Sequence, residues 1–224
     1  GELIAIIGKS GAGKSTLLHI LACIDNYQEG EYYIDDVLVK DLSESQYAKI
    51  RNEKIGMVMQ DFALVEDFTA LENVMIPLNF SKKKVSDKKE KALAALKSVG
   101  IEELAKKLCS KLSGGQKQRL ITASTLAMGQ KIVILDEPLA NLDTAGAEML
   151  MSTLKALAKA GYCIIVIEHR LDVVLPFVDK VFHVGNRNVN EITDRENYLK
   201  EQSTEIEDTC STFSGTLPAF SLAD

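Results

Sequence analysis

The sequence predicts an α/β fold in which a mostly parallel sheet is interrupted by a helical lobe. Short apolar runs typical of buried strands occur at residues 2–8, 55–60, 132–135 and 163–167. Helical patterns separate several of these runs, and strands that alternate with helices favour parallel βαβ units. Between residues 61 and 130 the apolar alternation fades and helical stretches take over, which predicts the lobe.

Each predicted element has its own signal. The strand over 2–8 ends at a glycine, and the helix over 14–24 has apolar residues at helical spacing. Residues 30–40 predict short strands around a turn of two consecutive aspartates. The strand over 55–60 ends on a glutamine.

The second half repeats the alternation. Within the lobe, a helix is expected over 86–99, with Gly100 as its C-terminal stop. A buried strand follows Lys131, and a helix over 144–160 then ends at Gly161 before the next strand. These signals indicate a return to the α/β core after the lobe.

The expected organisation is therefore a core in two pieces. Residues 1–60 and 131–190 make the α/β core, and residues 61–130 make the helical lobe. Residues 191–224 form a tail, rich in Ser, Thr, Glu and Asp with few apolar residues, which we expect to be weakly ordered.

Composition excludes several classes of protein. The net charge of −6 argues against a surface built mainly for nucleic acid, although a local basic patch stays compatible with it. The longest apolar runs are far shorter than the roughly 20 residues of a membrane-spanning helix. The chain starts in a strand pattern, so we expect no signal peptide. Its four cysteines have no CxxC spacing, which favours reduced thiols in a cytosolic protein over a zinc site.

The strongest motif lies between the first strand and the first helix, where G-x-x-x-x-G-K-[ST] is matched at every fixed position. Glycines let successive N–H groups face inward as an anion site, and the helix adds its positive N-terminal end. Lys14 supplies a charge for the β- and γ-phosphates, and the Ser15 hydroxyl can bind Mg²⁺. The predicted nucleotide-binding residues are Gly8, Lys9, Ser10, Gly11, Ala12, Gly13, Lys14, Ser15 and Thr16.

A second motif supports the first. Four aliphatic residues at 132–135 deliver Asp136 and Glu137 to the carboxyl edge of a parallel sheet, where ligands of such sheets bind. Asp136 is suited to hold Mg²⁺ through its water shell. Glu137 can polarise an attacking water as a general base. Together the two motifs predict a P-loop NTPase core that binds a nucleotide and Mg²⁺, and many phosphoryl-transfer enzymes carry both motifs.

A third motif separates this chain from other phosphoryl-transfer enzymes. Leu112, Ser113, Gly114, Gly115 and Gln116, followed by Lys-Gln-Arg, resemble residue for residue the signature of ATP-binding-cassette ATPases. The resemblance covers roughly residues 1–190. Ser113 can cap the following helix, and the two glycines leave backbone N–H groups exposed.

The resemblance implies how the chain works. In the family, this signature closes on the γ-phosphate held by a second domain, so that two ATP molecules are sandwiched head to tail. Ser113, Gly114, Gly115 and Gln116 would thus serve the pocket of a partner copy. A homodimer is the expected assembly.

Three further positions match the family. Gln60 resembles the glutamine that senses Mg²⁺ and the attacking water. Asp143, in the loop 140–143, resembles the loop that contacts the opposite domain. His169 falls where the family has its γ-phosphate switch histidine, which the resemblance makes the third expected catalytic residue beside Glu137 and Gln60. His19 and His183 lack such support and are taken as structural.

The chain also departs from the family pattern. The aromatic that stacks on adenine precedes the phosphate loop in the family and is absent here, so a truncated or engineered form and a lower nucleotide affinity are expected. Residues 1–120 are similar to macrolide-export and lipoprotein-release ATPases. Residues 131–185 are more similar to uptake ATPases of the energy-coupling type. A mosaic and an unusual natural lineage both fit this pattern.

The resulting expectation is an ATPase that powers a transporter. Its partners would be a second cassette and separate transmembrane subunits, with no nucleic acid. The chain would lie in the cytoplasm against the inner face of the membrane. Two alternatives stay open: a nucleotide-binding cassette with little turnover, and a non-transport cassette ATPase. The transported substrate would be set by the membrane partner.

Overall fold

The structure is a computed structural model in which residues 1–58, 64–185 apart from 81–86, 188–195 and 197–198 are described. The chain divides into two compact units, Gly1–Glu191 and Ile192–Asp224. All helices and strands discussed below belong to the first unit.

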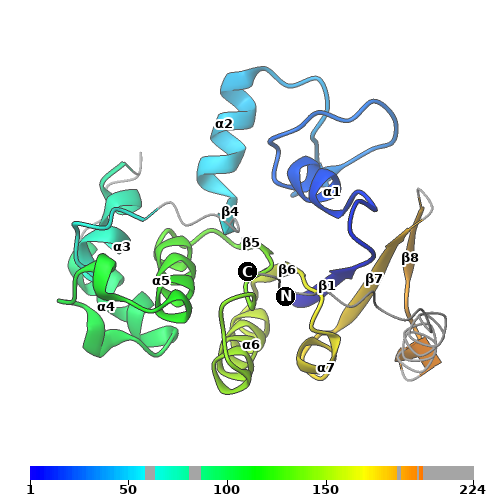
Figure 1. Ribbon diagram of the computed structural model, residues 1–224. Helices are drawn as coiled ribbons and strands as arrows, with labels where there is room; N and C mark the ends of the chain where they lie inside the picture. Colours follow the sequence, from blue (N-terminus) through cyan, green and yellow to red (C-terminus); the bar gives the residue numbers. More distant parts are fainter. Residues whose placement is uncertain (59–63, 81–86, 186–187, 196, 199–224) are drawn as a thin grey trace, which may run out of the picture. The chain divides into compact units, whose positions relative to one another are not determined.

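A sheet of strands in the order β4-β5-β6-β1-β7-β8 forms the centre of this unit (Figure 1). All neighbouring pairs are parallel except β7 and β8, so the predicted mostly parallel sheet is confirmed. Branched aliphatic residues dominate the central strands, as expected for strands covered on both faces. The strands are β1 (Glu2–Ile7), β4 (Ile55–Val58), β5 (Ile132–Asp136), β6 (Cys163–Ile167), β7 (Lys180–Gly185) and β8 (Asn188–Glu191).

Helices cover both faces of the sheet. Figure 1 shows α1 (Lys14–Leu21) on one face and α6 (Thr144–Lys159) and α7 (Leu171–Val174) on the other. On the α1 face, Leu18 packs into a core with Ile6 and Ile134. Leu150 and Leu154 of α6 are buried on the opposite side. Burying apolar area on both faces fixes the central strands in place.

The helices of the lobe enclose a core of their own. They lie beside the β4 edge of the sheet (Figure 1), and their apolar side chains, among them Val74, Leu96 and Leu120, are fully buried. Thr69 and Glu72 form a reciprocal capping pair at the start of α3, with N···O distances of 2.8 and 3.2 Å. The helical elements are α3 (Ala70–Phe80), α4 (Lys88–Ser98), α5 (Gly114–Ala127) and the short 3₁₀ turns Glu102–Leu104 and Cys109–Lys111.

Several elements differ from the sequence predictions. The first helix ends at Leu21 rather than residue 24, because Cys23 has a left-handed backbone (φ 57°) that breaks the helical path. The helix α2 (Glu44–Glu53) and the strands β7 and β8 were not predicted. The α2 helix escapes a periodicity test because Tyr47 is its one buried residue.

The predicted aspartate turn is confirmed. Asp35 and Asp36 join β2 (Tyr33–Ile34) to β3 (Val37–Leu38), and both have positive φ angles of 49° and 62°. Two consecutive positive φ values define the mirror-image turn that suits the twist of a hairpin, and aspartate tolerates them.

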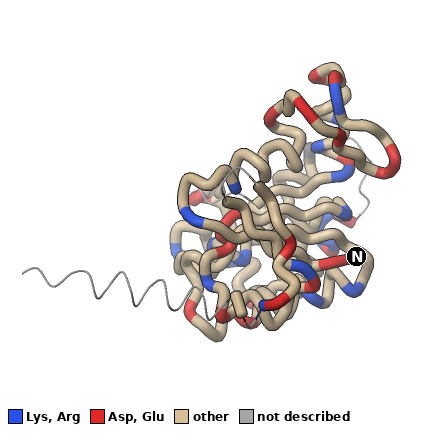
Figure 2. The backbone as a smooth tube through the Cα atoms, turned by 90° about the vertical axis from the view of Figure 1, so that its right-hand side faces the viewer, with Lys and Arg blue, Asp and Glu red and all other residues tan. Residues whose placement is uncertain are grey.

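Charge and hydropathy show no membrane-spanning character in the described chain. Acidic and basic residues both occur along the described backbone in Figure 2. None of the described helices is both long and apolar enough to cross a bilayer. Cys23, Cys109 and Cys163 are free thiols.

Candidate functional site

The strand order brings three loop segments of the chain together. β6 lies between β1 and β5, so the carboxyl ends of all three strands meet at one edge. Ile6, Ile167 and Asp136 are register partners across the three strands. The phosphate loop, the Asp136-Glu137 pair and His169 therefore leave the sheet side by side, although they are far apart in the sequence. This is the crevice where parallel α/β sheets bind ligands.

The phosphate loop connects β1 to α1. A Cβ on Gly8 would lie 2.2 Å from the carbonyl oxygen of Val184, and its φ of 150° also disfavours a side chain. Gly13 is the N-cap of α1, and no described side chain caps this helix. The N-terminal turn of α1 thus faces the pocket without a side chain across it, as an anion-binding helix end requires.

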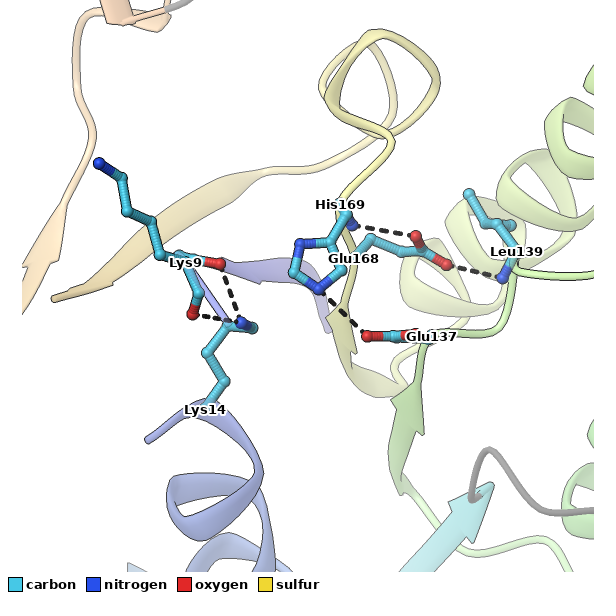
Figure 3. A network of polar contacts seen from close by, with 7 residues as sticks. Lys9, Lys14, Glu137, Leu139, Glu168 and His169 are labelled. Carbon is cyan, nitrogen blue, oxygen red and sulfur yellow. Dashed lines mark hydrogen bonds and ion pairs between the residues drawn. The ribbon is translucent and has the colours of Figure 1, made fainter. Parts of the chain in front are cut away.

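Lys14 is buried, and its ammonium is held on the loop itself. Its Nζ donates to the carbonyl oxygens of Gly8 at 2.8 Å and Lys9 at 3.0 Å (Figure 3). These two hydrogen bonds partly compensate the charge of the ammonium group and fix its position. The ammonium therefore lies against the backbone of the phosphate loop, where phosphate oxygens would be bound.

Asp136 ends β5 and is only partly buried. Burial raises the pKa of its carboxyl above the usual range, and the adjacent Glu137 raises it further. The positive charges of His19, Lys14 and His169 act in the opposite direction. An acid held in this way is stabilised as a carboxylate by any additional cation.

Glu137 and His169 meet across the pocket. The Nε2 of His169 lies 3.1 Å from Oε1 of Glu137 (Figure 3). Glu137 has φ 47°, a left-handed backbone that is rare outside glycine and is found at functional sites. This conformation turns the chain sharply after β5, and the carboxylate lies against His169 in the segment that follows β6.

Two functional candidates flank His169 and were missed by the sequence predictions. Glu168 is 3% exposed, and its carboxylate accepts hydrogen bonds from the backbone N–H groups of Leu139 at 2.6 Å and His169 at 3.1 Å. Arg170 donates to the carbonyl oxygen of Leu142 at 2.9 Å. An acid directly after an apolar strand, the same pattern as Glu137 after β5, was the available signal.

A cavity of about 240 Å³ joins most of the predicted residues. Its lining consists of Ser10, Gly11, Gly13, Lys14, Ser15, Thr16, Asp136, Glu137, Ile167 and His169. The predicted residues Gly8, Lys9 and Ala12 lie in the same loop outside this lining. Gln60 lies outside the described residues. The structure therefore gathers the phosphate loop, the two acids and the histidine in one cavity.

The signature residues form a separate region. Ser113 caps α5: its Oγ accepts from Gln116 N–H at 3.3 Å, and Gln116 Oε1 accepts from Ser113 N–H at 3.1 Å. The predicted cap is confirmed. Ser113 and Gly114 are exposed, and none of the four signature residues lines the described cavity.

The signature packs against the loop 140–143 of its own chain. A Cβ on Gly115 would lie 3.1 Å from the carbonyl oxygen of Asn141 and 2.9 Å from a methyl carbon of Leu142. Asp143 caps α6 by accepting from Gly146 N–H at 2.8 Å. The signature and this loop thus present adjoining exposed residues, Ser113, Gly114 and Asn141.

The fold and the cavity define a class: a P-loop NTPase with an inserted helical lobe. The comparisons with known proteins specify the family. The family model described as "ABC transporter" matches residues 1–140. The chain belongs to this family, the ATP-binding cassettes of ABC transporters.

Individual relatives agree with the family. The chain is 39% identical over 194 residues to the ABC transporter ATP-binding protein MJ0796 of Methanocaldococcus jannaschii, covering 84% of this chain and 82% of that protein. It is 35% identical over 189 residues to the macrolide export ATP-binding/permease protein MacB of Vibrio parahaemolyticus. That match covers 84% of this chain and 29% of MacB, so the similarity concerns a part of the larger protein.

Solved structures show the same fold. MJ0796 in a dimeric post-hydrolysis state bound to ADP and Pi superposes with a TM-score of 0.75 at 36% identity, covering 85% of each chain. The structure of cbiO1 of Clostridium perfringens, part of the ABC transporter complex cbiONQ, superposes with a TM-score of 0.79 at 31% identity. That match covers 93% of this chain and 83% of cbiO1. The chain is accordingly an ATP-binding and ATP-hydrolysing domain of an ABC transporter.

Proposed function

We propose that this chain hydrolyses Mg²⁺-ATP as a head-to-tail homodimer and thereby drives separate transmembrane subunits. One observation carries the proposal: the cavity gathers the phosphate loop and the acids, whereas the signature lies outside its described lining. A complete site then needs the signature of a second copy. MJ0796, a relative over 84% of this chain, has been solved as a dimer.

The phosphates bind along residues Gly8 to Thr16. Backbone N–H groups of the loop and the N-terminus of α1 face the anion, and Lys14 lies ready to neutralise the β- and γ-phosphates. The adenine has no aromatic partner assigned within this chain. The phosphates therefore supply most of the recognition that the described residues can offer.

The residues present fit a magnesium ion. The Ser15 hydroxyl and the Asp136 carboxylate both line the cavity and are hard oxygen ligands. Magnesium usually keeps several waters and phosphate oxygens as ligands, so two protein oxygen ligands suffice for it. When bound, the ion would neutralise charge that develops on the phosphates. Gln60 is the third proposed ligand.

Glu137 is the proposed general base. It orients a water for in-line attack on the γ-phosphorus and accepts its proton as the bond to the bridging oxygen of ADP breaks. His169, at 3.1 Å from Oε1 of Glu137, holds this carboxylate and reaches toward the γ-phosphate. Gln60 completes the proposed catalytic set.

The second copy is proposed to contribute its signature. Ser113, Gly114, Gly115 and Gln116 would approach the γ-phosphate of the opposite pocket with the N-terminus of α5. Asp143 would help to form the contact between the copies. Identical subunits satisfy this arrangement with two equal sites, the usual closed two-fold assembly.

The helical lobe offers the contact for membrane subunits. A largely apolar cavity of about 440 Å³ lies between β4, α3 and α5, lined among others by Met57, Ile76 and Ile121. A short segment of a membrane subunit would fit it, and this supports our proposal that the chain lies in the cytoplasm at the inner face of the membrane. We propose residues 61–130 as the lobe, residues 1–60 and 131–190 as the core, and residues 191–224 as a tail.

The test measures the ATPase rate and the oligomeric state of the Glu137→Gln variant. Loss of the base should lower kcat by about 10²–10⁴-fold while ATP still binds. Size-exclusion chromatography with ATP and Mg²⁺ should then show a dimer, and the same sample with EDTA a monomer. Asp179→Asn, an acid-to-amide change just before β7, should hydrolyse ATP like the parent. A parent that turns over no faster than Glu137→Gln contradicts catalysis by this site, and a monomer with ATP contradicts the dimer.

A further inference from the structure

Residues on both sides of His169 fasten it to the segment that follows Glu137. His169 itself is exposed, with 48% of its side chain accessible, so packing does little to hold the imidazole. Its neighbours Glu168 and Arg170 are buried and half-buried. Neither has a part in the chemistry proposed above, yet both bond to the loop after β5. Figure 3 shows the bond that Glu168 accepts from Leu139.

Glu168 uses its two oxygens on two segments. Oε1 accepts from Leu139 N–H at 2.6 Å, in the loop after Glu137, and Oε2 accepts from His169 N–H at 3.1 Å. Burial raises the pKa of Glu168, and hydrogen bonds from backbone N–H groups of residues 139, 169 and 170 oppose that rise. Burying a carboxylate costs free energy that burying an apolar side chain does not cost. Packing alone therefore does not explain a glutamate at this position. Its bonds bridge the ends of β5 and β6.

Arg170 makes the complementary contacts. Its Nη1 donates to the carbonyl oxygen of Leu142 at 2.9 Å, and the carbonyl oxygen of Leu139 lies at 3.5 Å. Leu139 is therefore approached through its N–H by Glu168 and through its carbonyl by Arg170. The same loop is closed internally by bonds from Ala140 N–H to Glu137 and from Leu142 N–H to Leu139.

Glu168 and Arg170, with their bonds to the loop 139–142, form a bracket that connects two parts of the proposed catalytic site. One end sets the backbone of His169 and the other holds the turn that begins at Glu137, so the Glu137–His169 distance depends on it. The loop held by Arg170 continues into Asn141 and Leu142, which pack against Gly115 of the signature.

We propose that Glu168 and Arg170 are positioning residues that hold His169 against Glu137 and set the loop 139–142. The inference rests on the proposed function of Glu137 and His169. Glu168 acts through these two residues and does not touch the substrate. Replacing it with glutamine turns one acceptor oxygen into a donor NH₂ group, so at least one of the backbone N–H groups that donate to it loses its bond.

The test is a double-mutant cycle on single-turnover hydrolysis of ATP. Glu168→Gln should lower the rate by about 10- to 100-fold, because small misplacements of catalytic groups have effects of this size. The KM for ATP should change little. In a His169→Ala background, Glu168→Gln should lower the rate by much less, since one of the two groups through which it acts is gone.

Asp179→Asn is the matched control. Its carboxylate also accepts a backbone N–H bond, from Leu3 at 2.8 Å, but at the start of β1, away from the cavity. This variant should show loss of stability without loss of rate. Arg170→Lys keeps the charge and loses the planar guanidinium. It should lower the single-turnover rate in the same way as Glu168→Gln, and it replaces that variant in the test if Glu168→Gln does not fold.

Two results would overturn the proposal. One is an equal loss of rate from the bracket variants with and without His169, which indicates a general structural role. The other is an unchanged rate in folded Glu168→Gln and Arg170→Lys. Both leave the proposed function intact if Glu137→Gln is inactive, whereas an active Glu137→Gln refutes the proposed function itself.

Discussion

Two helices of this chain begin with glycine-rich segments, and their N-termini are finished in different ways. At α1 the N-cap is Gly13, with no described side chain across the helix end, and Lys14, Asp136, Glu137 and His169 line the adjoining cavity. At α5 the N-cap is Ser113, which together with Gln116 closes a reciprocal pair of hydrogen bonds.

The difference shows which residues surround the N-terminus of each helix. The start of α1 belongs to an anion site whose charged side chains come from three strand ends of the same chain. The start of α5 is complete as local structure, exposed, and packed on Asn141 and Leu142. Under the proposed function, the first region binds the nucleotide and the second completes the site of another copy.

The largest expected effect is on ATP-dependent dimerisation. It is measured by mixing two variants, each of which damages one of the two regions. In the Glu137→Gln background, Lys14→Ala should weaken ATP binding by about 10- to 100-fold through loss of charge-assisted hydrogen bonds. Ser113→Arg should block the signature of the opposite site. Neither variant alone should dimerise at moderate ATP, whereas their mixture should, because one pocket then combines an intact Lys14 with an intact Ser113.

Light scattering and a count of bound ATP check this mixing prediction. The expected mixed dimer retains one nucleotide. A Ser113→Arg variant that dimerises by itself, or a mixture that stays monomeric, would show that the signature does not serve the pocket of a partner copy.

A smaller effect is expected at the glycine pair of the signature. Gly115→Ala places a Cβ 3.1 Å from the Asn141 carbonyl oxygen, and such overpacking costs about 1–3 kcal/mol. Gly114→Ala meets the Cβ of Asn141 at 3.4 Å, an ordinary contact, and should cost less. Denaturant unfolding and ATPase rates of both variants give the comparison. Equal losses from both would mean that packing on the loop 140–143 is unimportant.

Helix capping gives the next effect. Ser113→Ala and Ser43→Ala both remove the serine of a Ser-x-x-Gln capping pair, on α5 and α2, and each should lower stability by about 1 kcal/mol. Turnover should fall only for Ser113→Ala, because Ser43 lies on a helix outside both regions. The prediction fails if thermal unfolding and ATPase rate change in parallel for the two variants.

The smallest effect concerns an exposed ion pair beside the signature. The Lys117 ammonium, 2.8 Å from the Glu66 carboxylate, holds the pKa of that carboxyl below its usual range. A lowered acid pKa adds stability above the ordinary glutamate pKa, and this stability is lost as the pH falls through the lowered value. Thermal unfolding at about pH 7 should therefore distinguish Glu66→Gln from the parent slightly, and at about pH 3 not at all.

A difference that persists at the lower pH would place the effect of Glu66 elsewhere than in this pair. Turnover of Glu66→Gln should match that of the parent, because the pair lies outside the lining of the nucleotide cavity.

The chemistry-bearing segments could be predicted because each is local in the sequence. The phosphate loop, the Asp136-Glu137 pair and the Ser113 cap depend on neighbouring residues and a strand or helix next to them. Helix α2 was missed because its one buried residue gives no periodic signal, although the Ser43–Gln46 cap was present to find it. The bracket of Glu168 and Arg170 was missed because its partners lie about 30 residues away in the chain.

The sequence alone thus settles which residues can bind phosphate, ligate a cation or take a proton, because these abilities belong to side chains and short motifs. Tertiary structure decides which of them meet. Only the placement of β6 between β1 and β5 brings His169 to Glu137 and both to the phosphate loop. Hydrogen bonding between strands is long-range in the chain, and no local pattern specifies it. The same packing leaves the signature outside the cavity it is proposed to complete in a second copy.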